Sequence, residues 1–93
     1  MNIYEQAIEK FGRDSQMLKA IEEMSELTKE LSKYLNTSLK LDVAKLRQLE
    51  YNICDEIADV QITLDQIKIL FPAWQLREEK KLERLKELVK EEV

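Results

Sequence analysis

Residues 46–70, LRQLEYNICDEIADVQITLDQIKIL, carry the pattern that decides the fold. Apolar side chains recur there at alternating intervals of three and four residues, the spacing of one face of an α-helix. The positions are Leu46, Leu49, Ile53, Ile57, Val60, Leu64 and Ile67. Because proline cannot continue a helix, Pro72 predicts an end near Leu70 or Phe71.

The residues before this helix predict two more helices. The first is expected from about Ile3 to Phe11, with Gly12 ending it in a left-handed cap. The second is expected to begin at a cap formed by Asp14 or Ser15 and to end near Leu35. Its apolar stripe is Met17, Ile21, Met24, Leu31 and Leu35.

A loop over residues 36–41 and a cap at Asp42 are expected to join the second helix to the third. Pro72 suits the first turn of a fourth helix, which is rich in charge. Its apolar contacts are expected from Trp74, Leu82, Leu85 and Val89. Residues 1–93 are therefore predicted to form a single all-α domain of four helices.

Composition restricts the function. The 93 residues contain no histidine, which excludes most zinc hydrolase sites and histidine-based nucleophiles. A net charge of −4 argues against a nucleic-acid polymer as partner. The single cysteine, Cys54, suits a reducing cytoplasm, and no apolar run is long enough for a membrane span. No glycine-rich phosphate loop is present.

The third helix has a second apolar face. Ala58, Ile62 and Ile69 point nearly opposite to the main stripe, so the helix must be covered on both sides. We expect a homodimer or homotetramer with this helix at its centre. The alternative is that the first and fourth helices of the same chain cover the second face.

Two pairs of acids stand three residues apart, so that each pair shares one helix face: Glu23 with Glu26, and Glu56 with Asp59. If the helices pack side by side, the four carboxylates can converge and repel one another. A hard divalent cation with oxygen ligands, Mg²⁺ or Mn²⁺, relieves that repulsion. For Glu56, which lies close to the apolar stripe, a salt bridge to Lys or Arg of another helix is the alternative, and acids at this spacing also occur on solvated faces.

The order of these motifs, Ile21-Glu22-Glu23-Met24-Ser25-Glu26-Leu27 followed by Asp55-Glu56-Ile57-Ala58-Asp59-Val60, resembles the signature of the MazG-like and all-α dUTPase-related superfamily. The flanks resemble small phage and Firmicute members, with Phe11-Gly12 and Gln16 before the first motif and Leu64-Asp65-Gln66 after the second. Lys81-Leu82-Glu83-Arg84-Leu85 is similar too. The resemblance covers nearly the whole chain and implies a MazG-like four-helix bundle completed by oligomerisation.

The resemblance also implies a function. Glu23, Glu26, Glu56 and Asp59 are expected to bind Mg²⁺, and a nucleoside triphosphate is expected to be hydrolysed to monophosphate and pyrophosphate. Further roles in the site are expected. Glu22 orients water or holds a further metal, and Lys81 and Arg84 contact phosphates, with a plain surface location as the alternative for these three. By the resemblance, Gln16 reads a base edge.

Two other classes of protein stay open. One is a non-catalytic helical module of the same fold that mediates oligomeric interactions or senses nucleotides. The other is a plain coiled-coil scaffold without a site, against which the acids beside the apolar stripe of the third helix count.

Overall fold

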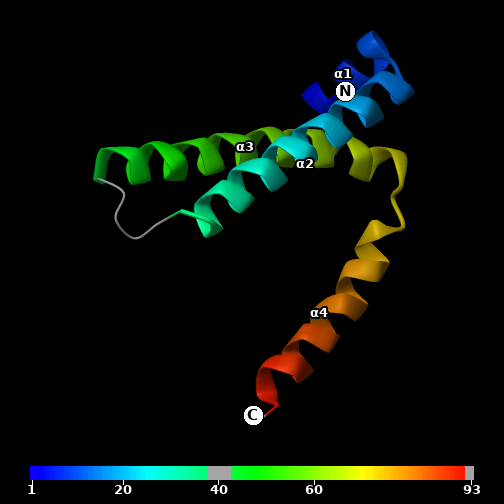
Figure 1. Cartoon of the computed structure of the whole chain (residues 1–93). Helices are drawn as coiled ribbons and strands as arrows, with labels where there is room; N and C mark the ends of the chain where they lie inside the picture. Colours follow the sequence, from blue (N-terminus) through cyan, green and yellow to red (C-terminus); the bar gives the residue numbers. More distant parts are fainter. Residues whose placement is uncertain (38–42, 92–93) are drawn as a thin grey trace.

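The computed structural model describes residues 1–37 and 43–91, and every described element of secondary structure is an α-helix (Figure 1). The helices are α1 (Ile3–Phe11), α2 (Arg13–Leu35), α3 (Val43–Leu70) and α4 (Trp74–Lys90). The prediction of an all-α chain with four helices is confirmed. Asp42, the predicted cap of α3, and most of the predicted loop lie outside the described residues.

Local interactions explain where α1 and α2 begin. Asn2 caps α1: its side chain accepts a 2.8 Å hydrogen bond from the backbone N–H of Glu5, whose carboxylate accepts one from Asn2 N–H. Gly12 ends α1 at φ 94° and ψ 151°, a positive φ that favours glycine but lies outside the left-handed helical region of the predicted cap. Because this one residue turns the chain, α2 begins at Arg13, and the predicted caps Asp14 and Ser15 already lie inside the helix.

The start of α4 also differs from the prediction. Pro72 and Ala73 form a turn after α3, and the helix begins at Trp74, so Pro72 precedes the first helical turn. The backbone N–H of Trp74 donates to the carbonyl of Phe71 at 3.2 Å, which closes this turn. Lys68 Nζ lies 4.4 Å from the centre of the Trp74 ring, a cation–π contact between α3 and α4.

The antiparallel pair of α2 and α3 is the centre of the molecule, and α1 packs on both (Figure 1). The face of α2 that packs on α3 is more polar than the predicted stripe. Its buried residues are Ala20, Glu23 and Glu30, whereas Ile21 and Leu35 of the predicted stripe are 57% and 83% exposed. The packed face is rotated by one residue, about 100°, from the predicted one.

In α3 the predicted stripe is largely kept on the packed side. Val60 is buried and the other positions of the stripe are half-buried, except Ile57, which is half exposed. The buried polar residues Thr63 and Gln66 lie beside this stripe. Ile62 and Ile69 on the second apolar face are also exposed. In one chain α1 and α4 thus cover this second face only in part: Ile69 lies beside Tyr4 and Trp74 but is still 40% exposed.

The helix α4 extends away from the other three and has no buried residue (Figure 1). Its apolar side chains Leu82, Leu85 and Val89 are exposed. Among the described residues only Ala20 and Val60 are buried and apolar, and no described helix is long and apolar enough to cross a membrane. One chain therefore has very little apolar core of its own.

Candidate metal centre

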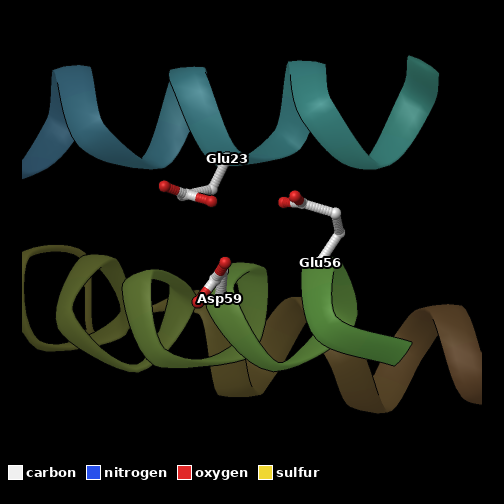
Figure 2. A group of neighbouring side chains, drawn as sticks. All are labelled: Glu23, Glu56 and Asp59. Carbon is white, nitrogen blue, oxygen red and sulfur yellow. The ribbon is translucent and has the colours of Figure 1, made fainter. Parts of the chain in front are cut away.

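Three of the four predicted metal ligands meet between α2 and α3. Glu23 of α2 and Glu56 and Asp59 of α3 each offer a carboxylate oxygen, and the three oxygens lie within 4.8 Å of one another (Figure 2). Glu56 and Asp59 are three residues apart on one helix face, and Glu23 lies on the packed face of α2. Antiparallel packing of the two helices thus brings together acids that are more than thirty residues apart in the sequence.

The carboxylates are partly removed from water. Glu23 is buried and the other two are half-buried. One oxygen of Glu56, Oε2, is buried without any hydrogen-bond partner in the described part of the chain. Since a buried charged oxygen is costly without a partner, this atom calls for a cation or a proton.

The raised pKa values of two acids in the cluster also indicate that it requires a cation or a proton. Burial raises the pKa of the Glu56 carboxyl, and Glu23, Asp59, Glu26 and Asp55 raise it further in that order. Burial likewise raises the pKa of Asp59, with Glu23 and Asp55 adding to the effect. The charged forms of these acids are therefore disfavoured in the protein without a cation.

One cation of the chain lies close to the cluster. Lys19 Nζ is 3.1 Å from Glu23 Oε1 and 4.0 Å from Glu22 Oε2, and these acids raise the pKa of Lys19. This pair joins two residues of α2, so it is not the expected alternative, in which Glu56 forms a salt bridge to a basic residue of another helix. None of the ion pairs in the described part of the chain includes Glu56 or Asp59.

The other predicted site residues lie at different distances from this centre. Glu26 is exposed and outside the group of three, although its charge contributes to the raised pKa of Glu56. Gln16 and Glu22 lie beside the centre, where they and Phe11 line a cavity of about 640 Å³. Lys81 and Arg84 are exposed on α4, which a single chain does not bring against the acids (Figure 1).

Sequence reasoning missed several residues of a second cavity, of about 170 Å³, next to the acids. It is lined by Gln16, Lys19, Glu23, Asp59, Ile62, Thr63 and Gln66. Thr63 and Gln66 follow Asp59 at intervals of four and three on the packed face of α3. That helical spacing from Asp59 was the available signal, but it becomes informative only when the packed face is known.

No protein-family description matches the chain, and neither a curated protein sequence nor a solved structure is significantly similar to it. Arguments about the function therefore rest on the site itself and on the motifs.

Proposed function

We propose that the protein is a Mg²⁺-dependent nucleoside triphosphate pyrophosphohydrolase of the MazG-like type, a cytoplasmic enzyme of nucleotide-pool house-cleaning. The observation that carries the proposal is the meeting of Glu23, Glu56 and Asp59 within 4.8 Å, at the positions of the two acidic motifs. A plain scaffold offers no reason to place three acids together at a packed interface.

The residues present fit magnesium. The donor atoms are all carboxylate oxygens, which Mg²⁺ and Mn²⁺ prefer, and the buried Glu56 Oε2 has no partner within the described residues. Glu23, Glu56 and Asp59 would hold the ion. Glu26, one turn from Glu23 on α2, is the proposed fourth ligand.

The proposed reaction is attack of water on the α-phosphorus, which breaks the bond to the bridging oxygen and releases a monophosphate and pyrophosphate. When bound, the metal supplies Lewis acidity toward phosphate oxygens and water. Glu22, exposed beside the cluster, is placed to orient the water and accept its proton. Lys19 borders the same cavity and is placed to donate to a phosphate oxygen.

The enzyme we propose is a homodimer or homotetramer. The chain has an accessible surface of 7816 Å², whereas a compact monomer of 11.1 kDa exposes about 5,700 Å². The excess of about 2,100 Å² is more than the roughly 800 Å² that each partner buries in a standard interface. A second copy that covers the outer apolar face of α2 and the apolar side of α4 accounts for this excess.

Oligomerisation also bears on Lys81 and Arg84. In one chain α4, which carries both cations, extends away from the other helices (Figure 1). Within the proposed oligomer, α4 packs against a second copy, and we propose that the two cations contact the phosphates of the partner's substrate. The site is then completed by a neighbouring chain.

A non-catalytic nucleotide-sensing or interaction module of the same fold is the second candidate. The ion pair between Lys19 and Glu23 favours it, because one predicted ligand already has a partner of opposite charge. Such a module binds a nucleotide without releasing pyrophosphate.

The test is pyrophosphate release from a panel of ribo- and deoxyribonucleoside triphosphates with Mg²⁺, for the wild type and Glu56→Gln. Gln keeps the shape of the side chain and removes its charge. Release by the wild type alone supports the enzyme. If both folded proteins release none from any nucleotide, the enzyme proposal fails and the sensing module is favoured.

A further inference from the structure

Gln66 and Glu30 are the two described residues outside the acidic cluster with a buried, unpartnered side-chain oxygen, and of these Gln66 lines a cavity. It lies on the packed face of α3, is only 5% exposed, and its Oε1 is buried with no hydrogen-bond partner in the described part of the chain. An unpaired buried carboxamide oxygen costs about 1–3 kcal/mol. Gln66 lines the smaller cavity beside the acids, so a ligand group in that cavity can supply the missing hydrogen bond.

The cavity extends from the acids to Gln66. Asp59 and Gln66 both line it, and two helical turns of α3, about 10 Å, separate them. On α2, Gln16 and Glu23 have the same separation of seven residues in the opposite direction. One end is therefore acidic and the other carries two neutral carboxamides.

The hydrogen-bonding groups at the neutral end indicate what binds there. The hydroxyl of Thr63 already donates to the Val60 carbonyl at 2.9 Å. Lys19, the cation of the cavity, lies at the acidic end, where its Nζ is 3.1 Å from Glu23 Oε1 and on the side proposed for the phosphates. The carboxamides remain, and each presents a donor and an acceptor side by side, which match the edge of a nucleobase rather than a phosphate.

The size of the cavity agrees with this. At about 170 Å³ it is smaller than the roughly 300–1,000 Å³ of pockets that enclose whole drug-sized ligands. It has room for one planar group but not for a nucleotide. The larger cavity shares Gln16 and Lys19 with it and has room for the remainder, and Ile62 offers an apolar wall for a ring.

We propose that Gln66 is a specificity-determining residue that hydrogen-bonds the base edge of the bound nucleotide. This rests on the proposed function in one respect, namely that the phosphates lie at the acidic end. It assigns the neutral end of the cavity to the nucleobase.

The experiment compares nucleoside triphosphates with methyl triphosphate, which has the phosphates but no base, for the wild type, Gln66→Met and Gln61→Met. Gln61 is the matched control, because it is exposed and lies on the same helix. Gln66→Met is expected to raise KM for the preferred nucleotide roughly 5- to 150-fold, the cost of a lost base contact. Hydrolysis of methyl triphosphate and the rise of Tm with Mg²⁺ are expected to stay unchanged, as is every property of Gln61→Met.

A purely structural role for Gln66 predicts something else: parallel losses with nucleotide and methyl triphosphate, or a changed oligomeric state. Either result overturns the inference, as does an unchanged KM for every nucleotide. Should Gln66→Met fail to fold, Gln66→Glu retains the length and an acceptor while losing the N–H donors. It is then expected to change the ratio of kcat/KM between bases, and an unchanged ratio counts against the inference.

A binding measurement distinguishes failure of this inference from failure of the proposed enzymatic activity. If the wild type hydrolyses nothing, Tm is measured with nucleoside triphosphate and with methyl triphosphate in Mg²⁺. A base-dependent rise of Tm that is lost in Gln66→Met and kept in Gln61→Met supports the role of Gln66 without catalysis. A wild type that responds equally to both compounds contradicts it.

Discussion

At the scale of single residues, Glu56 combines the most evidence for a metal. It has a buried oxygen without a partner among the described residues, and its pKa is raised first by burial and then by four acids, two on α2 and two on its own helix. Lys19 forms an ion pair with Glu23 but not with Glu56. The sequence predicted Glu56 as a ligand, but not that Lys19 stands beside the cluster.

We expect Glu56→Gln to abolish the rise of Tm with Mg²⁺ while leaving the metal-free protein at least as stable as the wild type. The substitution removes one of the mutually repelling charges and one ligand. The loss of metal affinity should exceed the roughly 10- to 100-fold that a lost outer-shell partner costs. Differential scanning fluorimetry across a Mg²⁺ titration measures both effects.

Glu87→Gln is the matched control, since Glu87 is exposed on α4 and far from the acids in one chain. An undiminished response of Glu56→Gln to Mg²⁺ would argue against Glu56 as a ligand.

The raised pKa values of Glu56 and Asp59 predict a pH dependence of stability. Both lie above the ordinary values of 4.5 and 3.8, so in the range just above these values the native state binds more protons than the unfolded chain. Stability from these groups is therefore gained as pH falls through the raised pKa values and lost as pH rises. Without metal, the stability of the wild type relative to Glu56→Gln should improve as the pH is lowered from neutral toward 4.5, the ordinary pKa of glutamic acid.

Thermal melts of both proteins in chelator give this difference directly. A wild type that loses stability relative to the variant on acidification has the opposite sign and contradicts the assignment.

At the scale of the helices, the boundaries follow short-range rules, although some caps differ from the predicted ones. Gly12 takes φ 94° and leaves no room for a separate cap before α2, so the helix starts two or three residues earlier than the sequence suggested. The face on which a helix packs is less predictable. In α2 the apolar stripe is exposed and the polar face with Glu23 and Glu30 is buried.

We expect Gly12→Ala to destabilise the protein by about 1–3 kcal/mol, because a residue with a Cβ is strained at positive φ. A Cβ at this position meets no atom within 4 Å, so backbone strain is the sole cost. Chemical denaturation measures the free energy of unfolding. Ser15→Ala, an exposed change in the first turns of α2, serves as control, and equal stabilities of the two variants would mean that φ at residue 12 is not constrained.

At the scale of the whole molecule, the chain is extended. Its radius of gyration is 17.2 Å, compared with about 12 Å for a compact domain of 93 residues. The exposed leucines of α4 and the exposed stripe of α2 have no cover within one chain. An extended chain with so few buried apolar residues is expected to obtain its core by association.

We therefore expect a dimer or tetramer at micromolar concentration in analytical ultracentrifugation. Leu85→Glu should weaken it, because it places a charge on the apolar side of α4. Gln75→Glu adds the same charge to the same helix at an already polar, exposed position and should leave the assembly intact. A wild-type monomer would refute the oligomer and leave the apolar faces unexplained.

Local periodicity was sufficient to predict four helices and to place Glu56 and Asp59 on one helix face, because both depend on the 100° turn per residue alone. The rotation of α2 about its axis was decided by tertiary structure, which buries Glu23 and leaves Glu26 exposed. The spacing from Gln16 through Ala20 to Glu23 is as helical as that of the apolar stripe, and the choice between them depends on what each face meets. For the same reason, only the packing of α2 on α3 buries Gln66 and brings Glu23 to Glu56 and Asp59, since contacts between distant segments are not contained in local spacing.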